Sequence, residues 1–288
     1  MPTAYRYGLL TIAMWSTSAT AFKLALATLS VSSVLAIAAT SSALLLLAVL
    51  AFQKRLSALW AFIGDHWRIV LGLAIINPVL YYLVLFKAYD ALLAQQAQAI
   101  NYSWAICLSL LSVFMLGQKL SSRDIAASVL AYVGVVVVAS GGDVQTLLGS
   151  NLPGVLWALL STLLWSFYWV YSSRAKLDPV LSLCSMFLLS LPMLWIMADW
   201  TQWQTSSLQS VAAATYVGFF EMGASFVTWL LALQHAAHVS RIANLIFLSP
   251  FLSLLWINGI LGEAVLPSTL LGLAMILLAT LWQQTQKS

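Results

Sequence analysis

Ionisable side chains inside long apolar stretches are the first residues of this sequence that could do chemistry. They are Lys23, Lys87, Asp90, Glu221, His235 and His238. A charge in hydrocarbon needs a partner or a path to water, so each is a candidate for function. Glu221 lies nearest the middle of its stretch, and we expect it to bind a cation, carry a proton or pair with a buried donor such as Lys23. Lys23, Lys87 and Asp90 lie near the ends of their stretches, where side chains reach the interface.

His235 and His238 are three residues apart and would share one helix face, as two metal ligands do. No third ligand stands near them in the sequence, and we expect no metal site. His235 therefore joins Glu221 as a candidate for ion coupling or for a buried polar network.

An enzymatic interpretation rests on two aspartates. Tyr89-Asp90 and Gly141-Gly142-Asp143 are similar to the paired aspartates of intramembrane proteases, in which two carboxyl groups share a proton. Ser140 stands where that pattern needs a glycine, and both aspartates end apolar runs, as solvated loop carboxylates do. Hydrolase, zinc-protease and phosphate-loop motifs are absent from the sequence. We expect no catalytic residue and no cofactor, and an intramembrane enzyme stays as an alternative.

Polar and aromatic side chains at membrane depth form a second group of candidates. Asn101 and Asn244 lie early in two apolar runs, and an amide there hydrogen-bonds a neighbouring helix or faces water. A helix–helix hydrogen bond in a membrane stabilises by about 0.6 kcal/mol. Deep rings mostly pack against other helices, but a ring face also binds an aromatic group or an ammonium ion. The deep rings are Trp15, Tyr81, Tyr82, Trp104, Trp165, Tyr168 and Trp169.

The composition of the chain indicates that these side chains are carried by segments embedded in a membrane. Of 288 residues, 62% are hydrophobic and only 7% are charged, with a mean hydropathy of +0.96. Soluble domains keep roughly a quarter of their residues charged, so this chain needs hydrocarbon as its solvent. The net charge of +4 is spread along the chain without a basic stripe, and we expect no nucleic-acid partner.

Ten apolar runs have the length of a membrane-spanning helix, roughly 20 residues. They predict an all-α integral membrane protein with the lipid bilayer as its solvent. Residues 1–27 resemble a signal peptide, but the run is long and Lys23 precedes the cleavage pattern, so we expect a first spanning helix. Aromatic belts are expected at Trp60, Trp67, Trp200 and Trp203. The runs lie near 7–27, 32–52, 69–89, 96–116, 123–141, 154–173, 178–197, 212–234, 239–259 and 266–284.

Basic residues predict the orientation, because cytoplasmic loops carry an excess of lysine and arginine. With a cytoplasmic N-terminus, only Lys23 and Lys87 fall toward the outer side, whereas Asp143, Asp199 and Glu263 fall in outer loops. Both termini are then cytoplasmic, which requires an even number of spans. The inner side receives Arg6, Lys54, Arg55, Arg68, Lys119, Arg123, Arg174, Lys176, Arg241 and Lys287.

The two halves of the sequence resemble each other. Trp15-Ser16 in the first run recurs as Trp165-Ser166 in the sixth, and Leu116-Gly117-Gln118 after the fourth recurs as Leu261-Gly262-Glu263 after the ninth. We therefore expect one five-helix repeat in residues 1–145 and a second in residues 146–288. Five is an odd number, so the second repeat enters the membrane from the opposite side, as in inverted-repeat transporters.

These features resemble the drug/metabolite transporter superfamily in its EamA-type branch, over essentially the whole chain. Short strings are also similar to a bacterial aromatic amino-acid exporter of that branch, among them Asn101-Tyr102-Ser103-Trp104 and Gly117-Gln118-Lys119. The proline expected after Trp104 is Ala105 here, so the sequence gives no proline-based reason to expect a kink in the fourth helix.

The resemblance implies a transporter of the inner membrane that exports amino acids, aromatic ones above all, by alternating access through a central cavity. Another small metabolite or drug is the alternative substrate, and a non-transporting membrane scaffold is a further class. The sequence carries no pattern for oligomeric state. The resemblance places the following residues around the cavity as the substrate-binding set: Trp15, Ser16, Tyr82, Asn101, Trp104, Trp165, Tyr168 and Asn244.

Overall fold

The computed structural model describes residues 3–116, 122–143, 152–235, 242 and 244–284, and this part of the chain is helical without a strand. Its elements are α1 (Thr3–Leu26), α2 (Val31–Phe52), α3 (Leu56–Ala74), η1 (Ile75–Leu80), α4 (Tyr81–Ala91), α5 (Ala94–Asn101), α6 (Trp104–Leu116), α7 (Ser122–Ser140), α9 (Leu152–Ala175), α10 (Pro179–Met197), α11 (Leu208–Tyr216), η2 (Val217–Ala224), α12 (Ser225–Gln234), η3 (Asn244–Leu248), α14 (Ser249–Leu261) and α15 (Pro267–Gln284).

Six helical runs of the described part are long and apolar enough to cross a membrane. Shorter apolar helices follow at Ile125–Ser140, Leu245–Leu261 and Pro267–Trp282. The predicted class, a helical multi-pass membrane protein, is confirmed. The long runs are Thr3–Leu26, Val31–Phe52, Leu56–Ala91, Leu152–Ser172, Pro179–Met197 and Leu208–Gln234.

The helices form two compact units, and each unit takes one stretch from either half of the sequence. The first unit comprises Met1–Leu83 and Ala175–Ser253, and the second comprises Val84–Arg174 and Leu254–Ser288.

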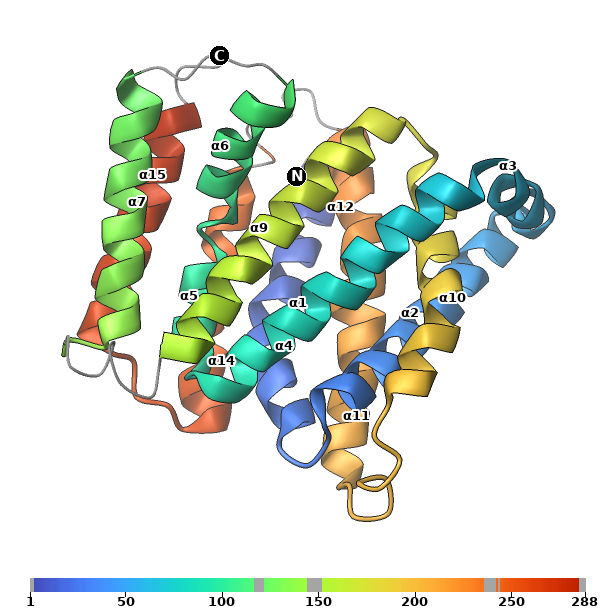
Figure 1. The fold of residues 1–288 in the computed structure, drawn as a ribbon, viewed down its shortest axis with the longest axis horizontal. Coiled ribbons are helices and arrows are strands. Elements are labelled where there is room, and N and C mark those ends of the chain that lie inside the picture. The colour runs from blue at the N-terminus through green and yellow to red at the C-terminus, as the bar shows by residue number, and fades with distance from the viewer. Residues whose placement is uncertain (1–2, 117–121, 144–151, 236–241, 243, 285–288) are drawn as a thin grey trace. The chain divides into compact units, whose positions relative to one another are not determined.

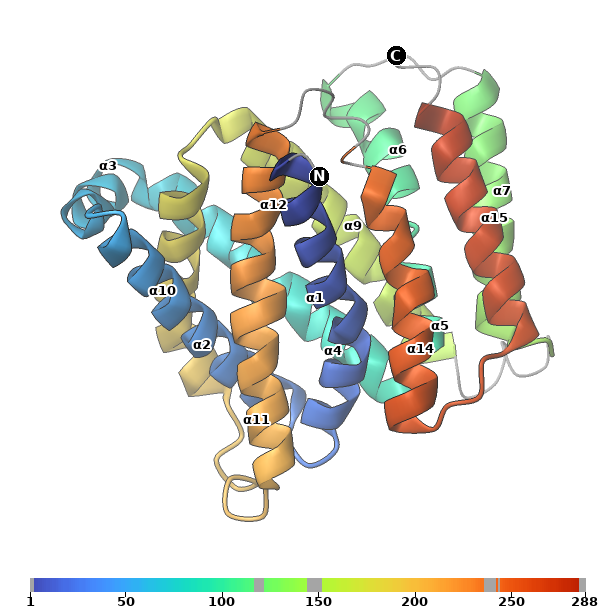
Figure 2. The same cartoon turned by 180° about the vertical axis from the view of Figure 1, so that it is seen from behind.

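In the first unit, α1 packs along α11 and α12, while α2 packs against α10 and η2 (Figures 1 and 2). Hydroxyl pairs join α1 to its neighbours: Thr11 Oγ1 lies 2.7 Å from Thr228 Oγ1, and Thr17 Oγ1 lies 2.8 Å from the Tyr216 hydroxyl. Such pairs satisfy polar groups that hydrocarbon cannot.

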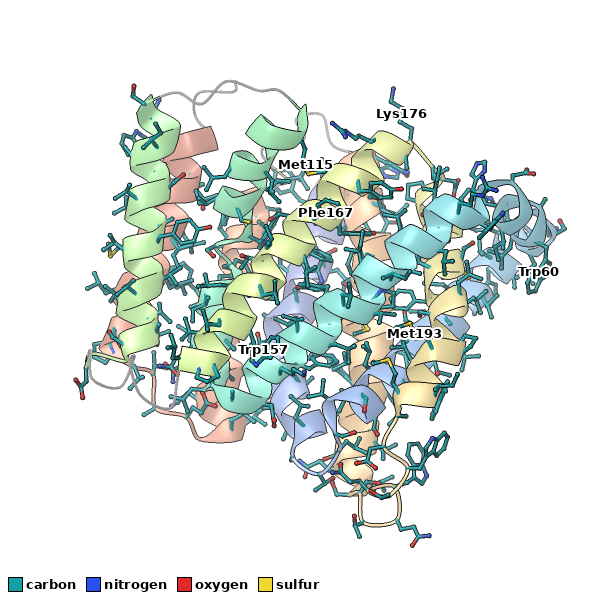
Figure 3. The ribbon with its side chains drawn as sticks, viewed as in Figure 1. Trp60, Met115, Trp157, Phe167, Lys176 and Met193 are labelled. Atoms are coloured by element: carbon teal, nitrogen blue, oxygen red, sulfur yellow. The ribbon has the colours of Figure 1, made fainter. Side chains whose placement is uncertain are left out.

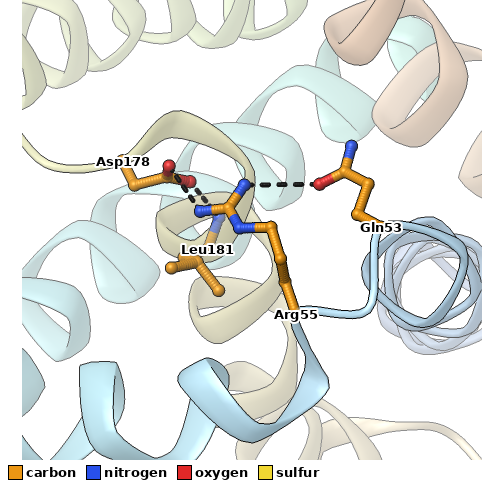
Figure 4. A network of polar contacts seen from close by, with 4 residues as sticks. All are labelled: Gln53, Arg55, Asp178 and Leu181. Atoms are coloured by element: carbon orange, nitrogen blue, oxygen red, sulfur yellow. Dashed lines mark hydrogen bonds and ion pairs between the residues drawn. The ribbon is translucent and has the colours of Figure 1, made fainter.

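The first unit also holds an ion pair at the turn between α2 and α3. Arg55 Nη2 lies 2.7 Å from Asp178 Oδ2, and Arg55 also donates to Gln53 (Figure 4). Asp178 accepts the N–H of Leu181 at 2.9 Å and thereby caps α10. Burial alone would raise the pKa of Asp178, but the Leu181 N–H and the Arg55 guanidinium outweigh it and hold that pKa below its ordinary value.

In the second unit, α7 and α15 run side by side in both views (Figures 1 and 2). Gly134 and Gly272 face each other there, and a β-carbon on Gly134 would lie 2.7 Å from the Gly272 carbonyl oxygen. Only glycine allows this approach, as at small-residue contacts of membrane helices. The start of α5 is tied to the α14–α15 loop, because Glu263 accepts the Ala94 N–H at 3.0 Å and Gln95 donates to the Ala264 carbonyl at 2.8 Å.

The predicted start of the third run was wrong, and the fourth run has a break that the sequence left open. The third helix begins at Leu56 rather than near residue 69, so Trp60 and Trp67 lie within α3; Trp60 is 71% exposed (Figure 3). That run bends at Asn77, whose φ and ψ of −141° and 119° are not helical, just before Pro78. The fourth run breaks between Asn101 and Trp104 although no proline stands there.

Candidate functional site

Glu221 and Tyr82 meet in the interior of the first unit. The Tyr82 hydroxyl lies 3.0 Å from Oε1 and 2.9 Å from Oε2 of Glu221. Glu221 is 8% exposed and Tyr82 is 1% exposed. The contact brings together one predicted substrate-binding residue and one predicted coupling residue, which are 139 positions apart in the chain.

Tyr82 and Glu221 are both held by helical segments with irregular backbone. Tyr82 follows η1, the bent segment with Asn77 and Pro78, and Glu221 lies within the π-helix η2. Gly218 of η2 packs directly on the Ala38 carbonyl of α2, where a β-carbon would also lie 2.6 Å from Ser41 Cβ. π-helical turns are rare and concentrate at functional sites, so this pair marks a candidate site on structural grounds alone.

Trp15 lies in an aromatic cluster of the first unit. Its ring centre is 5.5 Å from that of Trp229 and 6.1 Å from that of Phe226, the latter edge-to-face. Trp229 belongs to a core with Ala4, Ala232 and Ile242, and Trp15 packs against it half-buried. These distances are favourable for aromatic pairs, so the rings hold one another and leave part of Trp15 uncovered.

Ser16 and Thr17 use their hydroxyls on the α1 backbone. Ser16 donates to the Ala13 carbonyl at 2.8 Å, and Thr17 donates to the Met14 carbonyl at 2.7 Å. This helix-internal bonding is the ordinary use of serine and threonine in a helix. Ser16 is buried, and its assignment to the substrate-binding set stays a prediction.

Four predicted substrate-binding residues belong to the second unit: Asn101 and Trp104 flank the break between α5 and α6, and Trp165 and Tyr168 lie on α9. The Asn101 amide donates to Ser161 Oγ at 2.9 Å, and Ser166 donates to the Trp104 carbonyl at 2.9 Å. These two contacts tie the break to α9. Trp104 is the first residue of α6, and its carbonyl accepts the hydroxyl of Ser166, which belongs to the second copy of the Trp-Ser pair.

An aromatic cluster lies on α9 beside these hydrogen bonds. Trp165 and Tyr168 stack with ring centres 5.3 Å apart and an interplanar angle of 24°, and Trp169 meets Trp165 edge-on at 5.8 Å. Trp165 and Tyr168 are buried. The Nε1 atom of Trp169 is also buried, and no hydrogen-bond partner is found for it within the described residues. A polar ring edge of this kind is suited to a ligand acceptor.

The two remaining candidates lie near α12 and η3. His235 follows the end of α12 as an exposed residue, with Nδ1 2.8 Å from the Leu231 carbonyl and its ring 5.9 Å from that of Tyr7. It is not part of the Glu221–Tyr82 contact. Asn244 begins η3, its side chain lies outside the described residues, and so does His238. Groups of three or more metal-binding side chains are not found in the described part.

Ionisable groups near helix ends behave as interfacial residues. Asp90 and Asp143 are both exposed, which is the arrangement of solvated carboxylates rather than of a shared-proton pair. Lys87 is exposed and its Nζ lies 4.7 Å from the ring centre of Trp157, labelled in Figure 3. A lysine over an indole face at a helix end fits a membrane interface.

Comparisons with known proteins define the class. The chain is 25% identical over 224 residues to the uncharacterized inner membrane transporter YhbE of Escherichia coli, covering 73% of this chain and 68% of that protein. It is 24% identical over 218 residues to the uncharacterized transporter YvbV of Bacillus subtilis, covering 74% and 70%. A solved crystal structure aligns over 98% of this chain and 96% of its own at a TM-score of 0.66 and 20% identity, which shows a shared fold.

Apolar helices and these relatives together define a multi-pass inner membrane transporter. The model of the EamA-like transporter family matches twice, over residues 3–140 and 152–283. The chain belongs to the EamA-like transporter family, within the drug/metabolite transporter superfamily.

Proposed function

We propose that this transporter exports amino acids, mainly aromatic and other hydrophobic ones, from the cytoplasm by alternating access through a central cavity. The observation that carries the proposal is the pairing of aromatic clusters with polar groups in both units: Trp15 with Trp229 near Ser16, and Trp165 with Tyr168 near Asn101 and Ser166. Ring faces recognise aromatic side chains and ammonium groups, whereas amides and hydroxyls recognise carboxylates.

The proposed architecture has ten spanning helices in two inverted five-helix repeats, residues 1–145 and 146–288, with cytoplasmic termini. The double match of the family model, over 3–140 and 152–283, supports the repeat. The excess of basic residues in the predicted inner loops supports the orientation.

Shared strings support the substrate class. The segments Trp15-Ser16-Thr17 and Asn101-Tyr102-Ser103-Trp104 are similar to those of the bacterial aromatic amino-acid exporter YddG. In this chain, both segments contribute residues to the clusters described above, so the strings that carry the resemblance also carry the proposed recognition.

The test is efflux from proteoliposomes preloaded with radiolabelled amino acids, with a competition profile across all amino acids and a panel of other metabolites. We expect aromatic and large hydrophobic amino acids to leave fastest and to compete best. If only a metabolite other than an amino acid is exported, the proposed substrate class is wrong. If nothing in the panel is exported, the proposed transport function is refuted.

Trp15 and Trp104 provide the matching variants. Trp15→Ala removes the ring that faces Trp229 and Phe226, and Trp104→Ala removes a half-buried ring at the α5–α6 break. We expect efflux of aromatic amino acids to fall about two- to twelvefold, because losing one aromatic contact costs about 0.5–1.5 kcal/mol. Trp60→Ala is the control, since that ring is 71% exposed on α3. Unchanged rates in Trp15→Ala and Trp104→Ala would remove both residues from the binding set.

A further inference from the structure

Glu221 is the buried acidic side chain of the first unit, and the helix that carries it is not an ordinary α-helix. It lies near the middle of the apolar run Leu208–Gln234, in the π-helical turn η2. Its partner Tyr82 is the second residue of α4, which follows η1, the bend of another apolar run. One hydrogen-bonded contact therefore joins two membrane helices at their irregular segments, and broken helices are where transporters bind substrates and coupling ions.

The groups that face Glu221 give its charge little support. Both carboxyl oxygens receive their hydrogen bond from a neutral phenol. Among the elements packed against η2, α2 and α12 carry no titratable side chain, and α11 carries only Tyr216, which bonds Thr17. The charged or titratable side chains of α1 are at its ends: Tyr5, Arg6 and Tyr7 at the start and Lys23 near the finish.

The hydrogen-bond geometry accepts either protonation state. As a carboxylate, Glu221 receives the Tyr82 O–H, which lies at nearly equal distances, 3.0 Å and 2.9 Å, from both oxygens. As a neutral acid, Glu221 donates its own O–H to the same phenol oxygen, because a tyrosine hydroxyl is both donor and acceptor. Protonation of Glu221 therefore needs no rearrangement of the pair.

We propose that Glu221, positioned by Tyr82, is the proton-coupling site of this transporter, and that it exchanges one proton for the ammonium group of one exported substrate molecule. This inference rests on the proposed function and adds to it the coupling ion and the recognised group. An uncompensated carboxylate in a water-excluded site is costly, so the closed transporter requires a proton or a cation on Glu221.

Each step of the exchange is balanced. Facing the outside, the neutral acid forms when a proton from water binds the Glu221 carboxylate and the substrate ammonium leaves. Facing the cytoplasm, the proton dissociates to water and a substrate ammonium takes its place beside the carboxylate. Since both occupied forms are neutral at Glu221, only these two cross between the faces, and one proton enters for each substrate that leaves.

The experiment imposes a pH gradient on proteoliposomes that hold the full-length protein. With the lumen one pH unit more acidic than the bath, the membrane potential held at zero by potassium and valinomycin, and labelled phenylalanine on both sides at equal concentration, protons leave and the amino acid enters. We expect accumulation of about tenfold, the ratio that one proton per substrate allows for a one-unit gradient. Equal concentrations throughout, together with normal phenylalanine exchange without a gradient, would overturn the coupling and leave the proposed function intact.

Two variants separate coupling from structural support. Glu221→Gln keeps the size and a hydrogen bond to Tyr82 but cannot titrate, and we expect no accumulation in the pH gradient while the protein still purifies as a folded monodisperse species. Tyr82→Phe keeps the carboxyl group, so the accumulation ratio stays near tenfold while its rate of approach falls. Full accumulation by Glu221→Gln would refute the assignment, and so would a loss of the ratio in Tyr82→Phe. Failure of exchange for every amino acid in the wild type would instead refute the proposed function.

Discussion

Asp178 serves two purposes at the start of α10, and its variants separate them. It caps the helix through the Leu181 N–H and pairs with Arg55 at 2.7 Å. Asp178→Ala loses both, and we expect a loss of about 1.2–2 kcal/mol, of which the missing cap contributes about 1 kcal/mol. Asp178→Asn keeps the capping oxygen and loses only the charge. Since both partners are about one-third exposed, that loss is small, about 0.2–1 kcal/mol. Thermal unfolding in detergent compares the three proteins, and equal losses in both variants would contradict the ranking.

The same residue predicts a pH dependence of stability. The pKa of Asp178 is lower in the folded protein than its ordinary value of 3.8. A lowered pKa means that the carboxylate stabilises the fold fully above the ordinary value, and that this stabilisation disappears as the pH falls through the folded-state pKa. We expect the unfolding temperatures of wild type and Asp178→Asn to differ at neutral pH and to converge in acid below the ordinary pKa. A gap that widens in acid would show the opposite sign.

At the residue scale, the sequence indicates single groups better than their partners. Glu221 is a candidate because it interrupts an apolar run, and Tyr82 is one because it is a deep ring. Their contact spans 139 positions, and no local periodicity relates them. Arg55 and Asp178, 123 positions apart, were missed as a pair for the same reason. His235, the other predicted coupling candidate, is exposed just after α12 and is not part of the Glu221–Tyr82 contact.

At the scale of helices, close backbone contact holds η2 against α2 and gives a sharp steric prediction. A β-carbon on Gly218 would collide with the Ala38 carbonyl and lie 2.6 Å from Ser41 Cβ. We expect Gly218→Ala to destabilise the protein by about 1–3 kcal/mol, the usual cost of overpacking, and to lower its unfolding temperature by several degrees. Transport should fall as well, since η2 carries Glu221.

Gly64→Ala is the matched control for Gly218→Ala. A β-carbon at Gly64 of α3 meets no heavy atom within 4 Å. Alanine is the better helix former by about 1 kcal/mol, so this variant is expected to be as stable as the wild type or slightly more stable. Equal behaviour of the two variants would show that the α2–η2 contact is not as close as described.

Apolar runs define the helices well and their irregularities poorly. Run length and hydropathy are enough to locate α1, α2 and α10, because each is one uninterrupted apolar segment. The bend at Asn77 and the π-turn at η2 depend on what the neighbouring helices fill or leave open, so hydropathy does not reveal them. The break at Tyr102-Ser103 is instructive, because Ala105 stands where a proline would have indicated it. At that break the Tyr102 and Ser103 N–H groups donate to the Gln98 and Ile100 carbonyls, and the Asn101 amide and the Ser166 hydroxyl join the segment to α9.

At the scale of the whole chain, the predicted repeat and the compact units divide the molecule differently. The predicted repeat divides it near residue 145, whereas each unit combines one stretch from either half, 1–83 with 175–253 and 84–174 with 254–288. Internal similarity predicts related segments, but packing is decided by which faces are complementary. Glycine contacts such as Gly218 on α2 therefore join segments of different halves, and Trp15-Ser16 and Trp165-Ser166 come to lie in different units.

The proposed inversion of the repeat can be tested at one position shortly after each copy of the Leu-Gly-Gln/Glu string. Ser122 and Ala264 follow the two copies of the Leu-Gly-Gln/Glu string, and both are exposed. If the halves are inverted, Ala264→Cys faces outward and Ser122→Cys faces the cytoplasm. We expect a membrane-impermeant maleimide to label Ala264→Cys in intact cells, and Ser122→Cys only after lysis. Native Cys107 and Cys184 are buried, and the unmodified protein measures their background. Labelling of both variants from the same side would mean parallel halves, and would remove the symmetry on which exchange between two faces depends.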